Sequence, residues 1–130
     1  MSNSLIVEIS PGELIDKITI LEIKMEKIED ELQLLNVRLE LKSLLEAKNK
    51  YLGDLSSINV LIIELKEVNH SLWQIEDDLR QYERLKEFGP RFIELARSVY
   101  NKNDLRARLK RQINEALGST LKEEKSYSSY

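Results

Sequence analysis

Apolar residues recur at heptad spacing along two long stretches of the chain. The first stretch consists of Leu14, Ile18, Leu21, Met25, Ile28, Leu32, Leu35 and Leu39. The second consists of Ile58, Leu61, Leu65, Val68, Leu72, Ile75, Leu79 and Tyr82. A mean spacing of about 3.5 residues places these side chains on one side of a helix and favours a partner helix. The pattern predicts an all-α fold: a long antiparallel, coiled-coil-like helical hairpin with shorter C-terminal helices packed across it.

Capping residues predict where the first helices begin and break. Ser10 can accept a hydrogen bond from the amide of Glu13, and Glu13 can reach back to the amide of Ser10, as in a capping box. The first helix either runs unbroken to about residue 48 or is interrupted near Asp30, which can form a second capping box with Gln33. Both alternatives agree with the spacing of the apolar residues.

Turn residues predict the later boundaries. A turn at Tyr51–Asp54 separates the two heptad stretches, and the second long helix ends at residues 88–90, which read Phe-Gly-Pro. Asn101–Asp104 is predicted to interrupt the last third of the chain, with Asn103 as the cap of a final helix. Gly118 is predicted to end that helix.

The chain is expected to form one helical domain over residues 1–130, with an extended arm at 1–10 and a polar tail at 126–130. It has no cysteine, no apolar run long enough to span a membrane and no secretory signal, so a cytoplasmic location is expected. Ile20 and Ile23 lie off the heptad stripes, so either a third helix or a second subunit is expected to cover them. A homodimer is expected, with a contact between copies at Ile20, Ile23, Val37 and Leu41.

Charge is distributed unevenly along the chain. The net charge is −3, but residues 91–115 hold seven basic and three acidic side chains, which gives +4. Such a segment either pairs with the acidic helices or binds an anionic small molecule. Nucleic acid is disfavoured, because the chain is acidic overall and lacks a basic-aromatic pattern.

The candidate site lies where this basic segment would fold back onto the acidic helix before it. Arg106 and Lys110 are four residues apart and share a helix face, and a guanidinium group readily binds phosphate, sulfate or carboxylate. The same side chains could instead form one buried polar network near Tyr100. The candidate residues under either interpretation are Glu76, Asp77, Arg80, Arg97, Tyr100, Asn103, Asp104, Arg106 and Lys110.

Metal chemistry receives little support from the sequence. The pair Glu67 and His70 matches only half of a di-iron carboxylate motif, and the chain has a single histidine. A magnesium site would require four glutamates on two helices to converge, namely Glu26, Glu29, Glu64 and Glu67. We therefore expect no metal and no cofactor. Trp73 is expected to be a core residue rather than a ligand platform.

Five stretches of the chain resemble a family of small helical proteins from bacteria and marine phages that is catalogued as a domain of unknown function. They begin at Pro11 (PGELIDKITILEIK), Leu72 (LWQIEDDLR), Phe88 (FGPRFIELARSVY), Asn103 (NDLRARLKRQIN) and Glu123 (EEKSY). The resemblance covers nearly the whole chain and implies a fold and a family rather than an activity. It also implies a context of sugar transfer and surface polysaccharides.

The function expected from the sequence is that of a non-catalytic interaction or oligomerisation module with an anion-binding site near the basic C-terminal helices. The alternative is a small helical enzyme that acts on an anionic metabolite or a nucleotide sugar. Chorismate mutase is the natural comparison, because its helices carry inward-pointing arginines. The first 37 residues contain no arginine, which weakens that comparison. The second alternative is a magnesium-dependent nucleotide hydrolase.

Overall fold

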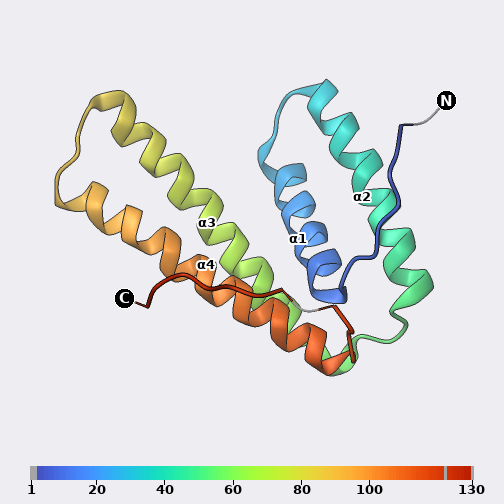
Figure 1. The fold of residues 1–130 in the computed structure, drawn as a ribbon. Coiled ribbons are helices and arrows are strands. Elements are labelled where there is room, and N and C mark those ends of the chain that lie inside the picture. The colour runs from blue at the N-terminus through green and yellow to red at the C-terminus, as the bar shows by residue number, and fades with distance from the viewer. Residues whose placement is uncertain (1–2, 122, 130) are drawn as a thin grey trace.

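The protein is described by a computed structural model that covers residues 3–121 and 123–129, and its regular elements there are helices. They are α1 (Pro11–Lys27), α2 (Glu31–Tyr51), the 3₁₀ turn η1 (Ser56–Ile58), α3 (Asn59–Leu85) and α4 (Pro90–Ala116). Figure 1 shows two helical hairpins, α1 with α2 and α3 with α4, which meet near the start of α1 and spread apart from there. The all-α prediction is confirmed.

The first heptad stretch is divided between two helices. Asp30 caps α2 by accepting a hydrogen bond from the amide of Gln33 at 3.3 Å, and the three residues before α2 reverse the chain. The predicted interruption near Asp30 is therefore confirmed, and the alternative of one unbroken helix is wrong. Three leucines of the predicted stripe consequently lie on the outer side of α2 rather than in a seam: Leu32, Leu35 and Leu39 are 74%, 47% and 60% exposed.

Each half of the chain forms its own hairpin, so the predicted hairpin between the two heptad stretches is not the one observed. Within the chain that the structure describes, α2 packs mainly against α1, whereas α3 packs mainly against α4. Helix α1 joins the two halves by packing against both α3 and α4. The central core lies at this junction and consists of Ile15, Ile58, Leu65, Val68, Leu109 and Ile113.

Helix α4 runs without a break through the predicted interruption. The prediction that Asn103 caps a separate final helix is wrong, because 27 consecutive residues from Pro90 to Ala116 are helical. The side chain of Asn101 donates a hydrogen bond to the carbonyl of Arg97 at 3.1 Å, an interaction that an uninterrupted helix accommodates. Burial of Leu95 and Leu109 on either side of this segment outweighs the low helix propensity of the asparagines.

Two of the apolar residues expected at a contact between copies are buried inside the chain. Ile23 is 1% exposed and Val37 is 8% exposed, so neither is available to a second subunit. Ile20 and Leu41 are half-buried. The expected contact through Ile23 and Val37 is wrong because helices of the same chain cover both positions. Helices α1 and α2 pack against each other, and α1 also packs against α3 and α4.

The two ends of the chain contain no helix or strand in the described residues 3–10, 119–121 and 123–129. In the arm, Leu5, Ile6 and Val7 are 90%, 99% and 76% exposed. Residues 1–2 of the predicted arm and residue 130 of the predicted tail lie outside the described residues. Among the described helices, none has a stretch both apolar and long enough to cross a membrane.

Candidate functional site

A cleft of about 510 Å³ opens between α1, α3 and α4. Its walls come from α1 (Ile20, Ile23), from α3 (Asn69, Leu72, Trp73, Glu76, Asp77, Arg80) and from α4 (Asn103, Arg106). Figure 1 shows that α1 and α3 diverge from the junction of the two hairpins. Residues of both helices line the cleft. Five of the nine residues predicted as a site therefore line one cleft: Glu76, Asp77, Arg80, Asn103 and Arg106.

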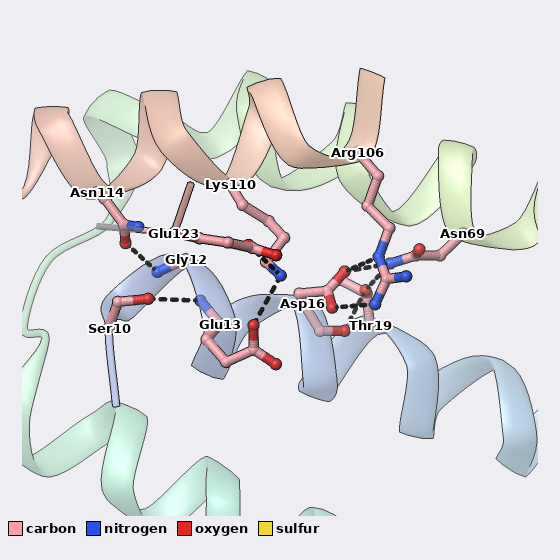
Figure 2. Close-up of polar contacts among 10 residues, drawn as sticks. All are labelled: Ser10, Gly12, Glu13, Asp16, Thr19, Asn69, Arg106, Lys110, Asn114 and Glu123. Carbon is pink, nitrogen blue, oxygen red and sulfur yellow. Dashed lines mark hydrogen bonds and ion pairs between the residues drawn. The ribbon is translucent and has the colours of Figure 1, made fainter. Parts of the chain in front are cut away.

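The inner end of the cleft is built on a buried carboxylate. Asp16 is fully buried, and its two oxygens accept hydrogen bonds from Nε and Nη2 of Arg106 at 2.9 and 2.6 Å. Asn69 donates to Oδ1 of Asp16 at 2.8 Å and to the hydroxyl of Thr19 at 2.9 Å. Figure 2 shows Arg106 of α4 and Asn69 of α3 converging on Asp16 and Thr19 of α1. We call these four residues the polar cluster.

The polar cluster holds Arg106 in a defined position while leaving part of it accessible. A bidentate carboxylate pair fixes both the position and the plane of a guanidinium group. The hydrogen bond and the charge of Asp16 raise the pKa of Arg106, against the opposing effect of burial, so this side chain stays cationic. Its side chain is still 29% exposed and lines the cleft. Arg106 can therefore present donors to a ligand without having to be ordered by it.

The outer end of the cleft carries a second arginine and two carboxylates on consecutive turns of α3. Arg80 donates a hydrogen bond from Nη1 to the carboxylate of Glu76, four residues earlier in the helix. This pair is exposed, so it contributes little to stability and can exchange partners. In the described part of the chain, no ion pair or hydrogen bond engages the side chain of Asp77.

The apolar part of the cleft consists of Ile20 and Ile23 from α1 and of Leu72 and Trp73 from α3. Trp73 is half-buried rather than enclosed in the core, so the expectation that it is purely a core residue is wrong. An aromatic side chain that remains partly accessible in a cleft can pack against an apolar or cationic group of a ligand.

The other predicted residues lie elsewhere on α4. Arg97 lines a separate shallow groove on α4 together with Pro90 and Ser98. Tyr100 and Asp104 line a groove formed with the C-terminal tail, where Lys125 pairs with Asp104 at 3.6 Å. The structure thus distributes the predicted residues over the cleft and two other grooves instead of gathering all of them in one hollow.

Lys110 forms a third polar centre, which we call the lysine bridge. Its Nζ lies 2.7 Å from Oε2 of Glu13 in α1 and 2.7 Å from Oε2 of Glu123 in the tail, and its side chain is only 8% exposed (Figure 2). Burial lowers the pKa of Lys110, but the hydrogen bonds that its ammonium group donates to Glu123 and Glu13 outweigh this effect, and the net pKa is raised. Glu13 is used here rather than in the predicted capping box, of which only the hydrogen bond from its amide to Ser10 forms.

Sequence reasoning missed the interior partners of these centres. Asn69 and Thr19 are buried in the polar cluster, and the side chain of Asn114 accepts a hydrogen bond from the amide of Gly12 at 2.7 Å. A weak signal existed for α1, because Asp16 and Thr19 are three residues apart and flank the apolar positions that face the core. No local signal connects them with Asn69, which lies 50 or more residues away.

The glutamates proposed for a magnesium site do not converge in the structure. In residues 3–121 and 123–129, no three histidine, cysteine, aspartate or glutamate side chains gather into a group that would hold a metal ion. Glu26 instead lies within 3.9 Å of His70 and 3.7 Å of Lys66. The hypothesis of a magnesium-dependent hydrolase thus lacks its required geometry.

Comparison with protein families shows which family the chain belongs to. Residues 5–130 match the model of DUF6165, a family of unknown function. The chain belongs to this family. The match confirms the resemblance to a family of unknown function and includes residues 5–10 of the arm, helices α1 to α4 and the tail. Neither the curated proteins nor the solved structures include a match to the chain.

Proposed function

We propose that the protein is a non-catalytic binding module that takes a small ligand with an anionic group in the cleft between α1, α3 and α4. The observation that carries the proposal is Arg106, which is held on a buried carboxylate and still exposes 29% of its side chain beside Trp73. Ligand sites are typically concave and largely apolar, with a few oriented polar groups, and the cleft has this composition.

Arg80 supplies the adjustable part of the proposed site. Its side chain is 68% exposed and its partner Glu76 lies on the same helix, so an anionic group can replace that partner at low cost. Arg106 cannot exchange its partner in this way, because Asp16 would then be left as an unpaired buried charge. The proposed ligand therefore contacts Arg80 through an exchange of partners and Arg106 through its remaining accessible edge.

Binding is favoured over catalysis by the state of the charged side chains. Asp16 is paired with Arg106 and Glu76 with Arg80, so these carboxylates stabilise neighbouring cations instead of facing a substrate as a general acid or base. The alternative of a small enzyme acting on an anionic metabolite would bind its substrate through the same two arginines and would also need an acid–base group. Asp77 is the one carboxylate of the cleft lining that has no ion pair among the described residues.

Thermal unfolding in the presence of anionic small molecules tests the proposed site. The panel contains nucleotide sugars, sugar phosphates, nucleoside phosphates and carboxylates, amino acids included, each with and without magnesium. A ligand that binds only the folded state adds about 2.7 kcal/mol of stability at 100 times its dissociation constant. We expect Arg80→Ala to remove the shift and Arg84→Ala, on the same helix but outside the cleft, to preserve it. A flat panel, or a shift unchanged in Arg80→Ala, would contradict the proposal.

We further propose that two copies of the chain associate through the outer side of α2. One side of this helix carries buried Val37 and faces α1, whereas Leu32, Leu35 and Leu39 form an exposed stripe on the other. Glu31 flanks this stripe near the start of α2, and Arg38 and Lys42 flank it further along. An antiparallel pair of α2 helices would bring the acidic start of one copy opposite the basic part of the other.

A further inference from the structure

The residues that line the cleft carry equal numbers of negative and positive charges, but one of the carboxylates, Asp77, has no arginine as its partner. Two carboxylates and two arginines line the cleft, but Glu76 is paired with Arg80, and Arg106 is paired with Asp16 outside the lining. Among the described residues, Asp77 forms no ion pair or hydrogen bond through its side chain. A ligand that carried only negative charge would therefore be repelled by Asp77, and by Glu76 once Arg80 had left it.

The placement of Asp77 on α3 suits a cationic group of a ligand. Trp73 and Asp77 are four residues apart and share one helix face, so their Cβ atoms lie about 5–6 Å apart. An ammonium group between them would meet a carboxylate on one side and the face of an indole ring on the other, where a cation is attracted by the ring electrons. Arg80 follows Asp77 by three residues on the same face.

We infer that the ligand is an amino-acid-like zwitterion with an apolar side chain. Its ammonium group would bind Asp77 beside Trp73, and its carboxylate would bind Arg80 in exchange for Glu76. Its apolar side chain would point inward, between Leu72 on α3 and the two isoleucines of α1, Ile20 and Ile23. This inference rests on the proposed function and deepens it, because it names the class of anionic ligand.

The arrangement also disfavours a polyphosphate ligand. A nucleoside diphosphate or triphosphate brings several negative charges, whereas the cleft offers one arginine that can exchange its partner and two carboxylates on the same helix. A zwitterion brings one charge of each sign and leaves the balance of the cleft unchanged. Neighbouring ammonium and carboxylate groups can also meet neighbouring acidic and basic side chains, because Asp77 and Arg80 are three residues apart on one helix face.

Fluorescence of Trp73 provides a direct test on the full-length protein, because Trp73 is the only tryptophan in the sequence. The probes are phenylalanine, phenethylamine and 3-phenylpropionate, which share a benzene ring and carry both charges, the positive charge only or the negative charge only. We expect phenylalanine to bind at least about tenfold more tightly than either of the other two, a ratio that corresponds to about 1.4 kcal/mol.

Two substitutions with matched controls separate the two charged groups. Asp77→Asn should weaken phenylalanine about tenfold without weakening 3-phenylpropionate, and Arg80→Gln should weaken phenylalanine without weakening phenethylamine. Asp78→Asn is the control for the first change, because Asp78 bonds Gln74 and lies outside the cleft lining. Arg84→Gln is the control for the second. Circular dichroism of each variant verifies that the helices are retained.

Each outcome of the probe series decides between the two proposals. If 3-phenylpropionate binds as tightly as phenylalanine, and Arg80→Gln weakens it, the zwitterion inference is overturned while the anion-binding function stands. If phenethylamine binds as tightly as phenylalanine, both the zwitterion inference and the anion-binding function are overturned. If none of the three probes changes the fluorescence at concentrations up to about 10 mM, the zwitterion inference is overturned. A probe with a dissociation constant of about 1 mM would be largely bound at that concentration.

Discussion

Gly12 lies where the backbone of α1 approaches the backbone of α4. A Cβ atom added at this position would lie 2.5 Å from the carbonyl oxygen of Lys110 and 2.8 Å from Oδ1 of Asn114. The first of these atoms belongs to a helix backbone and cannot rotate away. Because the amide of Gly12 also donates to Asn114 at 2.7 Å, the close approach is stabilised by a hydrogen bond. The glycine therefore permits a contact between helices rather than a turn.

Replacement of Gly12 by alanine is expected to lower the free energy of unfolding by about 2 kcal/mol, as is typical of forced overpacking in a core. Denaturant-induced unfolding monitored by circular dichroism measures this change. Gly89→Ala is the matched control, since an added Cβ there meets no atom within 4 Å. An equal effect of the two substitutions would contradict the interpretation that α1 and α4 meet at Gly12.

At the scale of elements, the ends of the helices follow local chemistry. Ser10 and Asp30 cap α1 and α2 as predicted, with hydrogen bonds of 3.2 and 3.3 Å to the expected amides. Gly53 and Gly118 adopt positive φ angles of 61° and 67° in the turns where the sequence placed them. The failure at Asn103 has a different origin, because a local cap signal there is overridden by the long contact between α3 and α4.

The outer stripe of α2 leads to a prediction about association. If two copies pack through this stripe, Leu35→Lys should change the molar mass measured by light scattering from that of a dimer to that of a monomer, because a buried lysine would lack a partner. Helicity should be unchanged, since Leu35 is 47% exposed within one chain. Tyr51→Lys, at an exposed position of α2 away from the stripe, should remain dimeric. A monomeric mass for the unmodified protein would rule out this contact.

At the scale of the whole molecule, the lysine bridge joins three segments that are distant in the sequence. Lys110 of α4 contacts Glu13 at the start of α1 and Glu123 in the tail. Next to it, Arg111 pairs with Glu124 at 3.0 Å, so the tail is attached to α4 by two consecutive residues. The first helix, the last helix and the tail are thus held together by one nearly buried ammonium group.

The bridge implies a dependence of stability on pH in the alkaline range. Because the pKa of Lys110 is raised in the folded state, its contribution to stability is fully present below the unfolded pKa of about 10.4 and is lost as pH rises through the higher folded pKa. The difference in unfolding free energy between the unmodified protein and Lys110→Met should therefore be constant up to about pH 10 and shrink above it. Urea unfolding of both proteins across this range measures the difference. A difference that grew above pH 10 would contradict the assignment, and Lys102→Met serves as a control.

The candidate site was only partly predictable from the sequence, because some of its residues share one helix and others are brought together only by the packing of different helices. Glu76, Asp77 and Arg80 lie on one turn and a half of α3, so their shared face follows from helical spacing alone. Arg106 joins them because α4 packs antiparallel to α3, and Asp16 joins because α1 crosses both. Arg97 was grouped with them by its charge, although it projects into another groove.

The sequence by itself determined that the chain is helical and that helix boundaries lie at Ser10, Gly53 and Gly118. It offered a break at Asp30 and acidic partners for the basic segment as one of two alternatives each. These properties depend on spacing, capping and charge, which act over a few residues. Only the tertiary structure decided that each half of the chain pairs with itself, that α4 is continuous, and that Asp16 receives Arg106. A heptad stripe indicates that a helix packs against another helix but does not identify which one. Contacts between residues 90 positions apart, such as Asp16 and Arg106, depend on how the whole core packs.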